Sequence, residues 1–145
     1  MLFRSRQWDD AISHFNQSLK LSPTAHAHNN LGMALANIGQ LEEARRHFEI
    51  AVQLNPRYAD ALNNLGMWHR VQGQWEPAAD YFQRAVDLGS VQHISFDNLV
   101  LARVALGQES QAISLLSRKT GLSPQDPRIM DILQGYRRML PGPSR

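Results

Sequence analysis

The stretch Asn30-Leu31-Gly32 recurs as Asn64-Leu65-Gly66, and Asn98-Leu99-Val100 stands the same distance further along. Both intervals equal about 34 residues, a period typical of a repeat array in which each unit is one small helical motif. Units of this kind pack against their neighbours along the chain. The sequence therefore predicts a stack of similar helical units rather than one irregular globule.

Positions outside that stretch keep the same register. The matched sets are Leu54, Leu88 and Leu122; Phe48, Phe82 and Leu116; Ala44, Ala78 and Ala112; and Gly39, Gly73 and Gly107. Within a unit the apolar positions recur at steps of three and four residues, which is helical periodicity. The Gly-Gln pairs at 39, 73 and 107 predict short turns between two helices. The proline near the end of a unit, such as Pro56, stops the second helix.

This pattern resembles the tetratricopeptide repeat, a helix–turn–helix unit of about 34 residues. The shared features are a Leu-Gly pair, a glycine at mid-repeat, an alanine followed by an aromatic residue, and a late proline. The resemblance implies an all-α fold, a right-handed α-solenoid of about seven helices, and it covers nearly all of one domain, 1–145. The expected parts are an incomplete repeat over 1–24, repeats over 25–58 and 59–92, a degenerate repeat over 93–126, a capping helix over 127–140 and a tail over 141–145.

The two ends depart from the pattern in different ways. In the third unit Val100 replaces the glycine, Lys119 replaces an alanine, and Gly121 shortens the second helix. The amphipathic segment 127–140 is therefore expected to cap the array, because the terminal units of a solenoid must face water.

At the other end, Trp8, Ala11 and Phe15 match the positions of Leu41, Ala44 and Phe48, at a spacing one residue shorter than the repeat period. Residues 7–21 thus correspond to the second helix of a unit whose first helix is missing. Either the array is longer than this chain, or the helix has an uncovered apolar flank that favours self-association.

Glycine inside a helix costs about 1 kcal/mol relative to alanine, so Gly32 and Gly66 need a compensating gain in packing. We expect them to face Ala44 and Ala78, where the absence of a side chain lets the two helices of a unit approach closely.

In the resembling family the first helices of successive units line a concave surface. Carried over to this sequence, the candidate peptide-binding residues are Asn29, Asn30, Met33, Asn37, Asn63, Asn64, Met67, Arg70, Asn98 and Leu101. Asn30, Asn64 and Asn98 would form a ladder similar to the asparagine ladder of O-linked N-acetylglucosamine transferases. A primary amide donates and accepts hydrogen bonds at once, so each rung could pair with a peptide backbone. The alternative is that these amides only satisfy neighbouring backbone or solvent, and that the methionines fill gaps between helices.

The sequence does not match one specialised group of repeat proteins, the co-chaperones. Co-chaperones that grip the C-terminal carboxylate of heat-shock proteins carry lysine, arginine and asparagine at set positions. Here those positions hold Asn29, Met33, Asn64, Ile94 and Asn98, so only Asn64 agrees and every basic residue is missing. A carboxylate clamp for heat-shock proteins is not expected.

Composition excludes several classes of function. The chain has no cysteine, so disulfides and cysteine-based zinc sites are impossible. Its thirteen arginines and two lysines are scattered, unlike the basic face of a nucleic-acid binder. Neither a membrane-spanning segment nor a secretory signal is present, which favours the cytoplasm. The six histidines form no metal-ligand set, and Ser90, His93 and Asp97 lack a nucleophile turn, so neither metal, cofactor nor catalysis is expected.

The sequence therefore favours a non-enzymatic interaction module, a scaffold or adaptor that binds a protein or peptide partner in its groove. Two alternatives stay open. The chain could be part of a larger multi-domain enzyme or of a secretion or assembly component, or it could be a self-associating assembly protein whose uncapped N-terminal helix makes a homo-oligomer.

Overall fold

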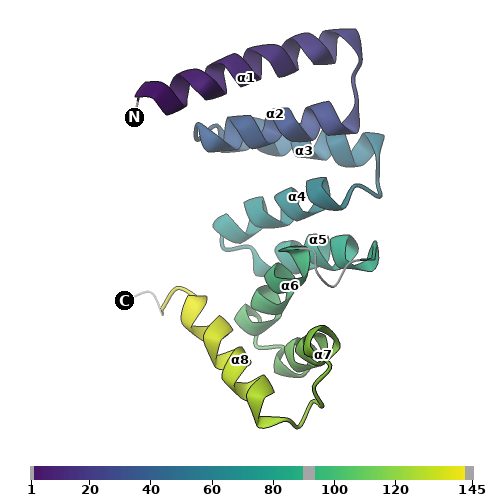
Figure 1. Cartoon of the computed structure of the whole chain (residues 1–145), viewed down its shortest axis with the longest axis vertical. Coiled ribbons are helices and arrows are strands. Elements are labelled where there is room, and N and C mark those ends of the chain that lie inside the picture. The colour runs from purple at the N-terminus through teal and green to yellow at the C-terminus, as the bar shows by residue number, and fades with distance from the viewer. Residues whose placement is uncertain (1, 90–93, 143–145) are drawn as a thin grey trace. The chain divides into compact units, whose positions relative to one another are not determined.

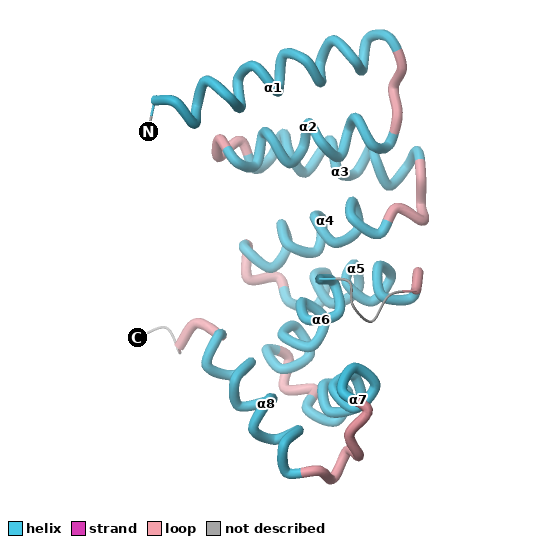
Figure 2. Tube along the Cα trace, in the orientation of Figure 1, coloured by secondary structure: helices cyan, strands magenta, loops and turns pink. Residues whose placement is uncertain are grey.

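The computed structural model describes residues 2–89 and 94–142 of the chain. These residues form eight α-helices joined by loops (Figures 1 and 2). The expected all-α helical-repeat fold is confirmed, with eight helices where about seven were expected. The chain divides into two compact units, Met1–Trp68 and His69–Arg145.

The first unit contains three complete helices and most of a fourth. They are α1 (Leu2–Leu21), α2 (Ala25–Asn37), α3 (Leu41–Leu54) and, up to Trp68, α4 (Ala59–Val71). Helix α2 packs against both α1 and α3 (Figure 1). Helix α1 begins at Leu2, five residues earlier than the expected segment 7–21.

The second unit contains the last residues of α4 followed by α5 (Trp75–Asp87), α6 (Ile94–Ala105), α7 (Glu109–Thr120) and α8 (Pro127–Met139). Helix α6 packs against α5, α7 and α8, and α7 also contacts α8. The segment expected to form a helix over 127–140 is α8, in which Ile129 and Leu133 are completely buried. The expected boundary between 59–92 and 93–126 lies outside the described residues.

Local chemistry fixes where these helices begin and end. The side chain of Thr24 accepts a hydrogen bond from the backbone N–H of Ala27 and caps α2. Asp126 caps α8 in the same way, with Pro127 at the first helical position. Gly39 follows α2 with a φ of +85°, a left-handed conformation that glycine adopts without a steric penalty. The predicted turn between paired helices is therefore confirmed at Gly39.

The core of the first unit is built around a close contact between α2 and α3. A Cβ atom added to Gly32 would stand 2.6 Å from Cε1 of Phe48 and 3.1 Å from the backbone oxygen of Ala44. Ala44 and Phe48 are 1% and 4% exposed. The expectation that a missing side chain at Gly32 permits close helix packing is confirmed, and the nearest neighbour is the Phe48 ring.

The third repeat replaces an alanine contact with a polar one. Lys119, on α7, donates to the Asp97 carboxylate on α6, and the Tyr136 hydroxyl of α8 donates to the same carboxylate at 2.5 Å. Burial together with this hydrogen bond raises the pKa of Tyr136 well above its ordinary value. Asp97 therefore connects three helices of the second unit.

Two histidines meet where α2 packs on α3. The Nδ1 atoms of His28 and His47 lie 2.9 Å apart, and the two rings stack with a centroid distance of 5.2 Å. Burial lowers the pKa of both imidazoles; the charge of His47 adds to the effect on His28, and Glu43 opposes it at His47. The pair is therefore held in a form that can share one proton between its nitrogens.

This pair makes a prediction about acid stability. In the unfolded chain each histidine binds a proton near its ordinary pKa of 6.5, whereas the folded protein binds it only at lower pH. The unfolded state thus takes up more protons, so stability is expected to fall as the pH drops below 6.5. Thermal melts between neutral pH and mildly acidic pH, compared for the native chain and His28→Gln, measure the effect. The melting temperature of the variant should depend less steeply on pH than that of the native chain. Equal slopes would contradict the lowered pKa values of the two histidines.

Candidate functional site

The residues expected to line the groove are distributed over both units. In the first unit α2 carries Asn29, Asn30, Met33 and Asn37, and α4 carries Asn63, Asn64 and Met67. In the second unit lie Arg70, Asn98 and Leu101. The arrangement of the first set is the more informative, because direct contacts join its two helices.

A side-chain hydrogen bond connects α2 and α4 within the first unit. The Asn64 Nδ2 atom donates to Oδ1 of Asn29 at 2.8 Å. Asn29 in turn directs its Nδ2 toward the Met33 sulfur at 3.6 Å, one turn further along α2. Since Asn29 is only 2% exposed, this bond satisfies an amide that would otherwise be buried without a partner.

An aromatic pair continues the same contact. The Tyr58 hydroxyl lies 2.9 Å from Nδ1 of His26, and the two rings stack at a centroid distance of 5.6 Å with only 14° between their planes. Burial and the charge of Asp60 raise the pKa of Tyr58, while a hydrogen bond with Asn29 opposes the shift. We define His26, Asn29, Met33, Tyr58 and Asn64 together as the α2–α4 cluster.

Sequence reasoning missed Tyr58. It precedes α4 and follows His26 by slightly less than one repeat period. The available signal was an aromatic residue about one repeat period after His26.

Three of the expected contact residues are buried. Asn29 is 2%, Asn63 7% and Leu101 4% exposed. A bound peptide could touch these side chains only if the helices moved apart, so the expectation that they contact a partner directly is corrected. They face neighbouring helices and support the surface from beneath.

The remaining residues of the first unit lie at the surface. Met33 is 46% exposed, and Asn30, Asn64 and Met67 are half-buried. Asn37 is exposed, and its Nδ2 donates to the Met33 backbone oxygen at 2.8 Å. Of the three rungs in the expected asparagine ladder, Asn64 already uses an amide hydrogen within the protein. In the second unit Arg70 and Asn98 are half-buried.

The sequence period and the paired helices agree with one family. The family model for the tetratricopeptide repeat matches residues 23–89. Residues 23–89 belong to the tetratricopeptide repeat family. Among curated proteins none matches the chain.

Solved structures of tetratricopeptide repeat proteins share the fold. The crystal structure of MamA superposes with a TM-score of 0.72 at 23% identity, covering 91% of this chain and 78% of MamA. YrrB, described as having an unusual peptide-binding site, gives a TM-score of 0.68 at 24% identity over 79% of this chain and 60% of its own. The first repeat domain of Spaghetti (RPAP3), bound to the HSP90 peptide SRMEEVD, gives 0.64 at 18% identity over 81% and 96%. At these identities the likeness establishes the fold.

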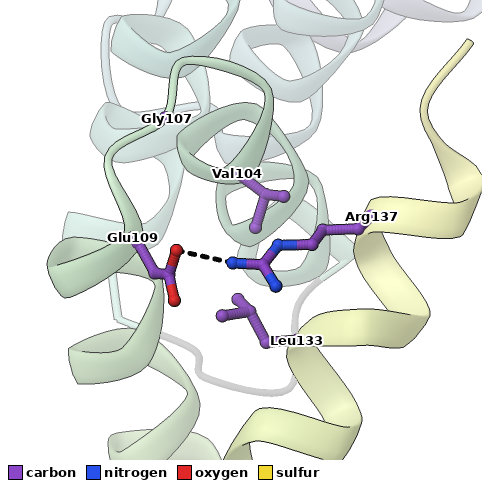
Figure 3. Close-up of a pocket in the computed structure, with 5 residues that line it drawn as sticks. All are labelled: Val104, Gly107, Glu109, Leu133 and Arg137. Carbon is purple, nitrogen blue, oxygen red and sulfur yellow. Dashed lines mark hydrogen bonds and ion pairs between the residues drawn. The ribbon is translucent and has the colours of Figure 1, made fainter. Parts of the chain in front are cut away.

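One hollow formed by the described residues is small. It lies in the second unit, where Arg137 of α8 extends toward Glu109 at the start of α7, beside Val104 and Leu133 (Figure 3). Arg137 Nη2 and Glu109 Oε2 are 2.5 Å apart, and the volume is about 210 Å³. Pockets for small ligands usually measure roughly 300–1,000 Å³. With its arginine already paired, this hollow offers little to a cofactor.

Residues 2–89 and 94–142 contain neither a candidate metal site nor a helix that could span a membrane. Within these ranges no group of three or more His, Cys, Asp or Glu side chains is placed to hold a metal ion. No described helix has the length and apolar composition that crossing a membrane requires. Ser90 and His93 lie outside the described residues.

Proposed function

We propose that this tetratricopeptide repeat protein is a non-enzymatic interaction module that binds a peptide segment of a partner protein over the α2–α4 cluster. One observation carries the proposal. The cluster places a half-exposed thioether, Met33, beside the half-buried amide of Asn64, and the buried Asn29 holds both through hydrogen bonds across two helices. An apolar contact beside fixed polar groups is the combination that holds a peptide side chain and its backbone together.

The energetics require both parts of that combination. A hydrogen bond contributes about 0.5–1.5 kcal/mol net, so a few amide bonds fall short of the roughly 8 kcal/mol behind a micromolar complex. The difference has to come from apolar burial, for which Met33 and the half-buried Met67 are available. Methionine side chains adapt to differently shaped partners, so the surface suits an apolar side chain of the peptide without demanding one shape.

The half-buried Asn30 and Asn64 are the proposed backbone contacts on the first unit. The remaining donor and acceptor capacity of Asn64 is available because Asn29 occupies only one of its amide hydrogens. In the second unit we propose the same role for Asn98, with Arg70 as an ionic contact for an acidic group of the partner.

Two similar structures support a peptide ligand in general terms. YrrB is described as having a peptide-binding site, and the Spaghetti domain holds an HSP90 peptide. The partner proposed here differs from the latter, because no lysine or arginine stands at Asn29, Met33, Asn64, Ile94 or Asn98. Recognition should therefore depend on internal peptide residues and not on a free C-terminal carboxylate.

The proposal makes a prediction about Met33→Glu. Linear peptides are first selected from a displayed library against the native chain, and the tightest is titrated against purified variants. Placing a charge at Met33 should weaken binding at least tenfold, equivalent to about 1.4 kcal/mol. The reason is that the new carboxylate would have to lose its water of hydration when the peptide covers it. The melting temperature should hold, since Met33 is 46% exposed.

Met130→Glu is the matched control, because Met130 is similarly exposed, at 40%, but lies on α8. It should bind the selected peptide like the native chain. Equal binding by both variants would move the site off the cluster, and failure to enrich any peptide would contradict the proposed function. Amidating the C-terminus of the peptide should leave its affinity unchanged. A large loss of affinity would show that the protein recognises a free C-terminal carboxylate, and would contradict the proposed recognition of internal residues.

A further inference from the structure

His26 lies on the side of α2 that carries the proposed peptide contacts. His26, Asn30, Met33 and Asn37 follow one another at intervals of four, three and four residues, which places them along one side of the helix. His26 and Asn37 are exposed, Met33 is 46% exposed and Asn30 is half-buried. A peptide that covers Met33 and Asn30 and continues toward the first turn of α2 therefore passes the His26 imidazole.

A hydrogen-bond network that begins at the buried Asn29 reaches this imidazole through Tyr58. Asn29 Oδ1 accepts from Asn64, and Asn29 Nδ2 directs one hydrogen toward the Met33 sulfur. Burial and the charge of Asp60 raise the pKa of Tyr58, whereas a hydrogen bond with Asn29 lowers it. A hydrogen bond lowers the pKa of a phenol when the phenol oxygen accepts it, because the negatively charged form accepts it more strongly. The second hydrogen of the Asn29 amide therefore goes to the Tyr58 oxygen.

The hydroxyl hydrogen of Tyr58 then points to His26. The Tyr58 oxygen and His26 Nδ1 lie 2.9 Å apart, and the two rings stack with 14° between their planes. Since the oxygen already accepts from Asn29, the O–H donates and Nδ1 accepts. A neutral imidazole carries its hydrogen on one nitrogen only, so in His26 this hydrogen stays on Nε2. A buried amide thus determines, through Tyr58, which nitrogen of an exposed histidine is the donor.

We propose that His26 is a specificity-determining contact of the peptide site, and that its Nε2–H donates to a backbone carbonyl oxygen of the bound peptide. The proposal rests on the proposed function of the α2–α4 cluster and adds the chemical group that the peptide presents at this point. Nε2 is the nitrogen left for a partner, because Tyr58 occupies Nδ1. An amide such as that of Asn64 can donate or accept, whereas neutral His26 in this tautomer only donates at Nε2. His26 therefore decides which backbone group of the peptide lies at this end of the site.

The charge near His26 favours a neutral acceptor over an acidic side chain. Asp60 follows His26 by one repeat period, at the corresponding position of α4, and its charge acts on Tyr58. A carboxylate of the peptide placed at His26 would be repelled by this charge, whereas a carbonyl oxygen carries no net charge. The acceptor is therefore assigned to the peptide backbone.

The tautomer of His26 can be measured without a peptide. Long-range proton–nitrogen NMR spectra at mildly alkaline pH distinguish a protonated imidazole nitrogen from an unprotonated one, and the His26 signals are those missing from the spectrum of His26→Gln. We expect the hydrogen on Nε2 in the native chain, and a shifted Nδ1 signal in Tyr58→Phe, which has no hydroxyl to donate. A hydrogen on Nδ1 in the native chain, or an Nδ1 signal unchanged by Tyr58→Phe, would overturn the proposal.

Two substitutions separate the two ring nitrogens in a binding experiment. The side-chain nitrogen of glutamine extends about as far as Nε2, whereas that of asparagine extends only about as far as Nδ1. With the peptide selected against the native chain, His26→Asn should weaken binding about two- to tenfold, the loss expected for one hydrogen bond, and His26→Gln should retain most of the affinity. His14→Asn is the matched control, because His14 is also exposed but lies on α1. Native affinity in His26→Asn, or equal losses in both variants of His26, would contradict a donor at Nε2.

Met33→Glu separates failure of this contact from failure of the proposed function. If Met33→Glu weakens binding and His26→Asn does not, the peptide site stands and the contact at His26 is wrong. If neither substitution weakens binding, or if no peptide is enriched, the proposed function fails and the contact fails with it.

Variants of the peptide locate the acceptor. Each aspartate or glutamate of the selected peptide is replaced by alanine in turn, and every peptide is titrated against the native chain and His26→Asn. We expect His26→Asn to cause the same fold-loss with all of them, because a backbone carbonyl is present in each. A peptide with which that loss disappears would assign the acceptor to an acidic side chain and overturn the backbone contact.

Discussion

Replacing Gly32 with valine is expected to lower the free energy of unfolding by about 2–3 kcal/mol. The new Cβ atom would stand 2.6 Å from the Phe48 ring and 3.1 Å from the backbone oxygen of Ala44. The ring cannot swing away, because it is 4% exposed, and the backbone oxygen belongs to α3. Better helix propensity returns only a few tenths of a kcal/mol. The melting temperature should therefore fall by several degrees.

Gly135→Ala is the matched control for this change. Gly135 also lies inside a helix, α8, but a Cβ atom there would have no heavy atom within 4 Å. Relief of the conformational cost of glycine should make this variant more stable, by up to about 1 kcal/mol. Thermal or urea unfolding of both proteins checks the pair. If both substitutions stabilise the protein, the close contact between α2 and α3 does not exist in solution.

Replacing Asp97 with alanine is expected to cost about 2 kcal/mol in the second unit, because a hydrogen bond to a charged group contributes about 1.5–3 kcal/mol. The substitution removes the acceptor for the Tyr136 hydroxyl and for Lys119, so a half-buried phenol loses its charged partner. The ion pair with Lys119 adds little, because its side chains are 35% and 45% exposed.

The pH dependence of this contribution has a definite sign. Burial acts to raise the pKa of Asp97, but the hydrogen bonds from Lys119 and Tyr136 outweigh it and hold the pKa below its ordinary value of 3.8. The contribution is therefore fully present above pH 3.8 and is lost as the pH falls through the folded-state pKa. The difference in stability between the native chain and Asp97→Ala should narrow in that acidic range.

Glu109→Ala provides the comparison for Asp97→Ala. It also removes a carboxylate that contacts α8, but Glu109 bonds to Arg137 in an ion pair whose side chains are 46% and 37% exposed, whereas Asp97 also accepts a hydrogen bond from the half-buried Tyr136 hydroxyl. An exposed pair of this kind contributes about 0–1 kcal/mol. Unfolding curves of the two variants at neutral pH should therefore differ clearly. A larger loss for Glu109→Ala would show that Asp97 is not the main connection to α8.

Much of the fold follows from the sequence by itself. The repeat period, the three- and four-residue steps and the turn glycines are local properties, because each depends on backbone preference and on which side of a helix a residue occupies. The close contact at Gly32 was predictable for the same reason, since a glycine inside a helix needs compensation from a neighbour in the next helix. The repeat period then placed Ala44 and Phe48 in that neighbour.

Only the tertiary structure decided which polar residues of the repeats are exposed. Asn29 and Asn30 are adjacent in sequence, yet Asn29 is 2% exposed and Asn30 is half-buried. About 100° of helix rotation separates them, and the position of α4 determines which one is covered. The bond from Asn64 to Asn29 and the contact between Tyr58 and His26 join residues that lie far apart in the sequence. Such pairs depend on how two helices are placed against each other, which no local pattern in the sequence specifies.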